Sequence, residues 1–327
     1  MNVYLTFDVE VWCNNWAELD QRFPAAYERY VYGRSPSGDY ALPATLQILN
    51  RHGLRGVFFV EPMFAARFGA EFLERIVHML REAGQDVQLH LHPEWTDEIQ
   101  PPLLADISRK RQHLAYYSVD EQTQLIAYAK HALLSAGATN VNAFRAGSFA
   151  ANRATYVALQ RNAIHIDSSL NELDSNSGQG IDALAQPTGH RMIGDVHAYP
   201  VTVFQDGWGR LRPAQVGACS FAELNDAMDS AHANGCGHFV IVSHNFEMLR
   251  PDRSIPDWVV VRRFERLCAY LGANTARFDV GLFSAAPQET QPTQRAHSTK
   301  WSTTVRWAEQ IQRRLPTANL GARPIHG

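Results

Sequence analysis

The sequence predicts an α/β fold in which a parallel sheet is covered by helices. Short apolar or β-branched runs alternate along the chain with longer segments of helical period, and this order is typical of parallel sheets. Several helical segments are followed by a glycine, as helix C-termini often are: Gly53, Gly84, Gly137 and Gly235. Hydrophobic residues make up 45% of the 327, so the chain can bury a large core without disulfide bonds.

About seven segments have the pattern of a strand. They cover residues 3–8, 56–60, 86–90, 143–145, 164–168, 199–204 and 238–243, with residues 278–283 as a further candidate. Helices are predicted at residues 44–52, 70–83, 120–136, 153–162, 221–234 and 258–271. Residues 12–40 are polar and rich in aromatic side chains, which predicts an extended loop of the kind that lines substrate sites in barrels.

The composition changes near residue 286, and this predicts two parts. Residues 1–285 form one β/α domain, since an α/β barrel uses about 250 residues as a single domain. Residues 286–327 form a polar tail that becomes basic around Arg306, Arg313 and Arg314. The tail either docks as a weak amphipathic helix or stays mobile, and contact with a membrane surface is a further alternative.

Charge and cysteine content exclude some classes of partner and site. With 30 basic and 33 acidic residues the formal charge is −3, which provides no field for holding a nucleic-acid backbone. The four cysteines, Cys13, Cys219, Cys236 and Cys268, are far apart and form no C-x-x-C pair, which indicates free thiols in a reducing compartment. The chain starts directly with a strand pattern and has no apolar run of about 18 residues, so we expect a cytoplasmic protein without a transmembrane segment.

Two strand ends carry residues that suit a metal site. Asp8 and Glu10 end the first strand, and His90 and His92 end the third; in each pair the two-residue spacing puts both side chains on one face. Two such histidines can hold one zinc ion at about 2.0–2.1 Å. Neither pair is decisive alone, because solvated acids are common at strand ends and histidines can be satisfied by hydrogen bonds.

Three further strand ends carry polar residues. Arg145 follows an apolar strand, where a permanent cation needs an anionic partner, and Asp8 is the natural one. Asp167 closes the next strand within a polar cluster, where capping or turn formation is as good an explanation as function. His244 ends the strand at residues 238–243 and suits a general acid. Because the active sites of barrels lie at the carboxyl ends of their strands, these residues predict one common site.

On these motifs, about residues 1–285 resemble the polysaccharide deacetylases of carbohydrate esterase family four. In that family a T-F-D-D strand end supplies a base and a metal ligand, and an H-x-x-x-H motif completes the metal site. An arginine motif orients the base, and a late strand carries a catalytic histidine. The resemblance implies a distorted β/α barrel with about seven parallel strands. It also implies metal-dependent removal of an N-acyl group, N-acetyl in the first place, from an amino sugar or glycan precursor.

The sequence departs from the family pattern at three places. Val9 stands where the second aspartate is usual, so the ligand role goes to Glu10. Glu94 stands four residues after His90, where the second histidine is usual; we assign that role to His92 and keep Glu94 as its substitute. Residues 145–148 read Arg-Ala-Gly-Ser in place of Arg-x-Pro-Tyr.

With these changes, the resemblance implies a role for each residue. Glu10, His90 and His92 hold a divalent metal, Zn²⁺ in the first place. Asp8 is the base, His244 the acid, Arg145 orients Asp8, and Asp167 tunes His244. The substrate is an N-acylated sugar or oligosaccharide.

Two other functions stay open. One is a different metal-dependent amide hydrolase on the same barrel, of deformylase or ureide type, because the chemistry needs only an amide bond. The general amidohydrolase barrels carry an H-x-H motif on the first strand, whereas here it ends the third, and this difference counts against that group. The other is a catalytically inactive carbohydrate-binding barrel, which Val9 makes reasonable.

Overall fold

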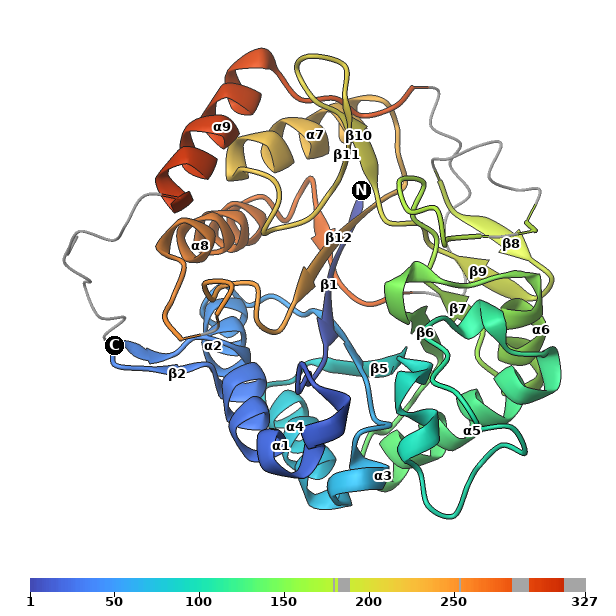
Figure 1. Ribbon diagram of the computed structural model, residues 1–327. Helices are drawn as coiled ribbons and strands as arrows, with labels where there is room; N and C mark the ends of the chain where they lie inside the picture. Colours follow the sequence, from blue (N-terminus) through green and yellow to red (C-terminus); the bar gives the residue numbers. More distant parts are fainter. Residues whose placement is uncertain (179, 182–188, 253, 284–293, 315–327) are drawn as a thin grey trace.

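A computed structural model of the protein describes residues 1–178, 180–181, 189–252, 254–283 and 294–314. Within them a nine-stranded sheet runs in the order β12-β1-β4-β5-β6-β7-β9-β8, and β13 pairs with β1 (Figure 1). All neighbours are parallel except β8 and β9. The strands are β1 (Asn2–Val9), β4 (Val57–Val60), β5 (Asp86–Leu91), β6 (Ala143–Ala146), β7 (Ile166–Asp167), β8 (Arg191–Ile193), β9 (Val196–Ala198), β12 (His238–His244) and β13 (Asp279–Val280).

Helices surround the sheet on its outer side (Figure 1). Three begin with a reciprocal capping box, for example α5 at Ser118 and Glu121, which satisfies free N–H groups of the first turn. In α4, residues Leu73, Ile76, Val77 and Leu80 are buried at helical spacing, so its apolar face packs inward. The longer helices are α2 (Leu42–Arg51), α4 (Ala70–Glu82), α5 (Val119–Ser135), α6 (Arg153–Arg161), α7 (Phe221–Ala233) and α8 (Trp258–Ala273). Short helical turns are α3 (Ala65–Phe68), η3 (Pro93–Glu98), η4 (Leu114–Tyr116) and η5 (Gly147–Phe149).

Strand β1 is buried on both faces, and the alternation of its side chains positions the site. Val3, Leu5 and Phe7 belong to the large core cluster under the helices. Tyr4 belongs to a second cluster that fills the inside of the curled sheet, with residues from β4, β6, β7 and β12. Because side chains alternate along a strand, Asp8 lies on the same inner face as Tyr4. The predicted distorted barrel of parallel strands is confirmed.

The predicted extended loop at residues 12–40 is wrong. This segment forms η1 (Trp16–Glu18), α1 (Leu19–Tyr27), η2 (Glu28–Tyr32) and a hairpin of β2 (Arg34–Ser35) and β3 (Gly38–Asp39). Leu19, Phe23 and Tyr27 are spaced four residues apart and are buried, and Phe23 stacks on Phe68 at 3.7 Å between ring centroids. This apolar face was hidden by the polar residues between its members and by Pro24, which is unusual inside a helix.

The strand predicted at residues 199–204 is misplaced. The sheet strand is β9, which ends at Ala198, while β10 (Val203–Gln205) pairs outside the sheet with β11 (Leu211–Pro213). Pro200 has no N–H to donate, so the ladder cannot continue through it. Strand β8 was not predicted, and the other predicted strands overlap the observed ones.

The end of the described chain forms helix α9 (Lys300–Arg314), which contacts α7 and α8. Its buried Arg306 forms ion pairs with Asp206 at 3.1 Å and with Glu223 at 2.9 Å. Residues 286–293 and 315–327 of the predicted tail lie outside the described residues, and the domain boundary at residue 285 stays a prediction. None of the helices described combines the length and hydrophobicity that a membrane crossing requires. All four cysteines are free.

The ion pairs of Arg306 predict that α9 contributes to the stability of the whole fold. Arg306→Met leaves the buried carboxylates of Asp206 and Glu223 without their cation, so we expect the free energy of unfolding to fall by about 3–5 kcal/mol. Urea denaturation measures this change, with the exposed Arg314→Met as control. An effect no larger than that of the control would show that α9 is not part of the cooperative unit.

Candidate functional site

The carboxyl ends of β1, β5, β6 and β12 meet around one cavity of about 620 Å³. The strand register places Asp8 beside His244 on neighbouring strands, and His90 beside Arg145. Trp12 and Trp16, from the segment predicted as a loop, form part of the wall. Of the residues singled out from the sequence, those that line the cavity are Asp8, Glu10, His90, His92, Glu94 and His244.

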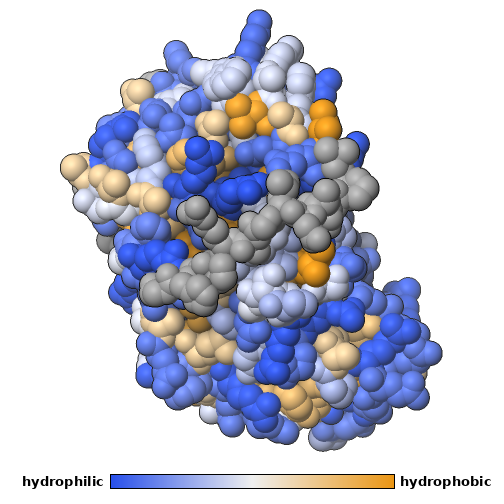
Figure 2. All heavy atoms as spheres, turned by 90° about the vertical axis from the view of Figure 1, so that its left-hand side faces the viewer, coloured by the Kyte–Doolittle hydropathy of each residue, from blue (hydrophilic) through white to orange (hydrophobic). Residues whose placement is uncertain are grey.

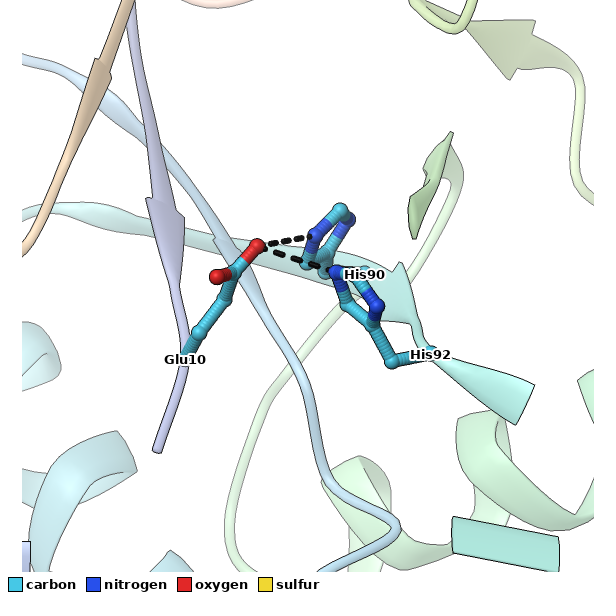
Figure 3. Close-up of side chains that lie close together, drawn as sticks. All are labelled: Glu10, His90 and His92. Carbon is cyan, nitrogen blue, oxygen red and sulfur yellow. Dashed lines mark hydrogen bonds and ion pairs between the residues drawn. The ribbon is translucent and has the colours of Figure 1, made fainter. Parts of the chain in front are cut away.

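Glu10, His90 and His92 line this cavity, and their side chains point toward one another (Figure 3). Oε1 of Glu10 lies 3.0 Å from Nε2 of His90 and 3.0 Å from Nε2 of His92. All three side chains are buried, and one ligand atom from each lies within 4.8 Å of the others. The structure therefore brings together the three residues predicted as metal ligands.

The outer nitrogens of the two imidazoles show what this group can bind. Nδ1 of His90 lies 2.8 Å from the carbonyl oxygen of Arg145, which can only accept, so Nδ1 carries the hydrogen. Nδ1 of His92 lies 3.3 Å from Oε2 of Glu94, which orients that ring in the same way. In the neutral imidazoles both Nε2 lone pairs then face the carboxylate oxygen of Glu10. Two nitrogen lone pairs and a carboxylate oxygen that face one another need a cation between them. Two imidazoles with one carboxylate are a set of ligands that suits Zn²⁺.

The pKa values follow from the same geometry. Burial by itself would raise the pKa of Glu10, but His92 and His90 outweigh it and hold that pKa well below its usual range. Burial would lower the pKa of His92, whereas Glu10 and Glu94 raise it well above its usual value. A proton on His92 thus balances the charge of Glu10, and a metal ion would replace that proton.

Several contacts fix the position of Glu10. Its second oxygen, Oε2, accepts a hydrogen bond of 2.7 Å from the indole N–H of Trp12. The buried side-chain amide of Asn245 pairs with the Glu10 backbone, accepting from its N–H and donating to its carbonyl, both at 3.1 Å. The same amide donates to the carbonyl of Tyr30 at 2.6 Å. Val9 points to the core on the opposite face of the strand. It therefore takes no part in the cluster, in which the carboxylate oxygen comes from Glu10.

The predicted pair of Asp8 and Arg145 is formed, with Nη1 of Arg145 donating to Oδ1 of Asp8 at 2.7 Å. Arg145 is fully buried and also donates to the hydroxyls of Thr6 and Ser168, each at 2.9 Å, and to the Ser168 carbonyl. Its guanidinium lies over the ring of Phe59 at 4.4 Å. Because a guanidinium keeps its charge, Arg145 gives Asp8 a permanent cationic partner and a fixed orientation.

The hydrogen-bond partner of His244 is Glu247, with Nδ1 and Oε2 2.9 Å apart. Burial would lower the pKa of His244, but Glu247, with smaller contributions from Glu10 and Asp8, raises it to about 9. His244 is therefore protonated at neutral pH, as a general acid must be. Glu247 was missed from the sequence, although a carboxylate three residues after a strand-end histidine is a signal that could have found it.

The hydrogen bonds of Asp167 go to residues other than His244, which it was predicted to tune. The carboxylate of Asp167 accepts from the hydroxyl of Tyr156 at 2.7 Å and from the N–H and hydroxyl of Ser169. Strand β7, which carries Asp167, is five positions from β12 in the strand order. Asp167 is buried and organises the turn after β7, as the capping explanation expects.

Gly147, directly after strand β6, lies against the ring of His92. A Cβ atom at this position would lie 2.6 Å from Nδ1 and Cε1 of His92, closer than real Cβ contacts come. The next two residues, Ser148 and Phe149, line the cavity and have left-handed φ angles of 51° and 52°. Such strain in residues other than glycine tends to occur at functional sites. The imidazole of His92 therefore occupies space that any residue larger than glycine would need.

Comparison with known proteins identifies the fold. No family model matches the sequence, and no curated protein matches it. A crystal structure from Mycobacterium smegmatis, provisionally described as a polysaccharide deacetylase, matches 99% of this chain and 94% of its own, with a TM-score of 0.52 and 18% identity. The chain has the fold of that protein.

Two further structures match this chain. A family 4 carbohydrate esterase from Streptomyces lividans, in complex with acetate, matches 91% of this chain and 98% of its own at 15% identity, with a TM-score of 0.44. A 4-alpha-glucanotransferase from Thermococcus litoralis matches 95% of this chain and 46% of its own at 10% identity, with a TM-score of 0.51. Because a 4-alpha-glucanotransferase also matches the fold of this chain, the reaction has to be argued from the site.

The contact between Gly147 and His92 predicts that Gly147→Ala weakens metal binding. The added methyl group displaces His92, so we expect the Kd for Zn²⁺ to rise about 10–100-fold, as for other changes that disturb the support of a ligand. Competition with a chromophoric chelator measures the Kd. Gly281→Ala is the matched control, because a Cβ there meets open space. An unchanged Kd in Gly147→Ala would contradict this account of the site.

Proposed function

We propose that the protein is a metal-dependent hydrolase that removes an N-acyl group, acetyl in the first place, from an amino sugar or glycan precursor. The observation that carries this proposal is the convergence of the Nε2 atoms of two buried imidazoles on one carboxylate oxygen of Glu10. Asp8, paired with Arg145, and His244, whose pKa is raised, lie beside each other on neighbouring strand ends. These are the groups that hydrolysis of an amide needs: a cation site, a base and an acid.

A Zn²⁺ ion held by Glu10, His90 and His92 would lower the pKa of a bound water toward about 7 and polarise the substrate carbonyl. Asp8, held by Arg145, accepts the proton of the water whose oxygen attacks the carbonyl carbon. His244, held by Glu247, donates its proton to the nitrogen as the C–N bond breaks. The products are a carboxylate and a free sugar amine. Before the next turnover Asp8 loses the proton that it accepted, and His244 regains the proton that it donated.

The cavity wall supports a sugar as the substrate. Trp12 and Trp16 line the cavity and both pack on the buried Trp95, so their rings are held in place. Lys110 lies 3.7 Å above the Trp16 ring and binds Asp97, while Gln112 lines the same wall. Aromatic faces beside hydrogen-bonding groups suit a pyranose, which has apolar faces and a polar rim. A volume of about 620 Å³ accommodates a short glycan or its end.

Substitution of Asp8 and of His90 tests proton transfer and metal binding separately. We expect Asp8→Asn to lower kcat about 10²–10⁴-fold while metal remains bound, because only the proton acceptor is lost. His90→Ala is expected to lose the metal itself. Elemental analysis and amine release from N-acetylated and N-formylated sugars, nucleotide sugars and short glycans measure both effects. Stoichiometric metal in His90→Ala, or bound metal without hydrolysis of any substrate in the unaltered chain, would refute the proposal.

The pKa of His244 predicts the alkaline side of the pH profile. A histidine whose pKa is raised to about 9 donates its proton below that pH, so kcat/KM is expected to fall as the pH rises through about 9. Glu247→Gln removes the anion that raises this pKa, and the alkaline limb moves to lower pH. The exposed Glu74→Gln is the control for a general change of charge. An alkaline limb that does not move in Glu247→Gln would argue against His244 as the acid.

A further inference from the structure

Helix α9 has the reverse of the usual polarity of a surface helix. Surface helices normally turn an apolar face to the core and a polar face to water. In α9 the buried residues are Ser302, Thr303 and Arg306. The residues that hold it are also polar: Glu309 pairs with Arg263 at 2.7 Å, and Arg313 pairs with Asp257 at 2.7 Å. The helix is thus fixed to the body by ion pairs and hydrogen bonds.

Its outward side carries large apolar side chains. Trp301 is 74% exposed, Ile311 63% and Trp307 41%. Trp208, in the turn between β10 and β11, is 46% exposed and stacks on Trp307, with ring centroids 4.5 Å apart. We call these four side chains the tryptophan face. Figure 2 shows the side of the molecule on which α9 lies, with hydrophobic side chains exposed as separate spots among hydrophilic ones.

The tryptophan face is not a random sample of the surface. Among the residues that the structure describes, ten large hydrophobic side chains are exposed, and four of them belong to this face. It also holds every exposed tryptophan among those ten. A concentration of large apolar side chains marks a surface that another molecule covers.

The exposed charged residues of α9 and of the β10–β11 segment are basic, and the acid nearest to the start of α9, Asp226, accepts two hydrogen bonds from Thr299. Lys300 and Arg314 at the two ends of α9 are exposed, and so is Arg210, two residues after Trp208. The acidic residues of α9 and of the β10–β11 segment are Glu309 and Asp206, and both are already paired with arginines. A cleft of about 270 Å³ beside α9 adds Arg262 and Arg266, partly offset by Glu265.

We propose that the tryptophan face docks on the surface of an anionic lipid bilayer. Tryptophan is enriched at membrane–water interfaces, where its ring lies among the headgroups and its N–H stays hydrated. A helix with apolar residues outward and cations at its ends lies flat in that layer, and the cations attract anionic headgroups. The fold holds α9 in this orientation before any contact is made.

The spacing of the side chains favours a bilayer over a protein partner. A stable protein interface needs a contiguous apolar centre within about 800 Å² on each partner. Here Thr304 and Lys300 lie on the same side of the helix as the apolar residues and separate them. A layer of lipid headgroups needs no contiguous apolar patch, because each exposed apolar side chain can insert into it separately. None of these residues lines the cavity at the strand ends, so the inference is independent of the proposed reaction.

Co-sedimentation of the full chain with vesicles tests the inference. We expect binding to mixed phosphatidylglycerol and phosphatidylcholine vesicles, weaker binding to phosphatidylcholine alone, and loss of binding at high salt. Trp301→Ala combined with Ile311→Ala is expected to lower the partition constant roughly tenfold. Lys300→Gln and Arg314→Gln are each expected to lower it roughly fivefold. All these side chains point outward, so thermal unfolding should stay unchanged.

The matched control removes exposed apolar side chains elsewhere: Tyr116→Ala combined with Leu134→Ala, which are 58% and 41% exposed. An equal loss of vesicle binding in this control would overturn the inference, because the effect would not depend on α9. Failure of the unaltered chain to bind anionic vesicles would overturn it as well. Two other results would also overturn the inference: concentration-dependent dimerisation in sedimentation velocity, and binding to an insoluble glycan in place of vesicles. Either result counts if Trp301→Ala combined with Ile311→Ala abolishes the dimerisation or the glycan binding.

Discussion

A permanent cation in the interior requires an anion, and Arg145 meets this requirement in a way that organises the whole site. Its guanidinium is fully buried and holds Asp8 at 2.7 Å, while its backbone carbonyl orients His90 through Nδ1 at 2.8 Å. One residue of β6 thus fixes the proposed base and one proposed metal ligand, which come from two other strands. Because the strands are parallel and in register, this single anchor sets the relative positions of β1, β5 and β6 at their carboxyl ends.

Two departures from the deacetylase motifs are explained by one contact. The second histidine lies two residues after His90 instead of four, and the resulting position of the His92 ring is against Gly147. A proline at residue 147, as in Arg-x-Pro-Tyr, would overlap that ring, so a change in the histidine motif requires a small residue in the arginine motif. Glu94, at the usual histidine position, remains useful because it orients His92 from behind. The third departure, Val9, faces the core, and Glu10 supplies the oxygen in its place.

The sequence was sufficient for features that depend on periodicity along one segment. Buried strands, and the polar residues that end them, are visible because a two-residue alternation stops at a charge, and this placed Asp8, Glu10, His90, His92 and His244 at one mouth. Pairing across the barrel is not visible in that way. Asp167 and His244 both end candidate strands in the sequence, but β7 and β12 are five positions apart in the strand order, and Glu247 is the actual hydrogen-bond partner of His244. Helix α1 was missed because Pro24 and the polar residues between its four buried residues hid the helical pattern.

The indole of Trp12 has a position that gives the centre an optical label. It donates to the carboxylate oxygen of Glu10 that faces away from the imidazoles, and its ring lies edge-on to His92 at 4.8 Å. Exchange of the His92 proton for a divalent ion changes the electric field at this indole without any movement of the backbone. The intrinsic fluorescence of the protein therefore contains a signal of whether the centre is occupied. Loading could be followed in real time without a dye, and a Trp12→Phe protein would identify the contribution of this one chromophore.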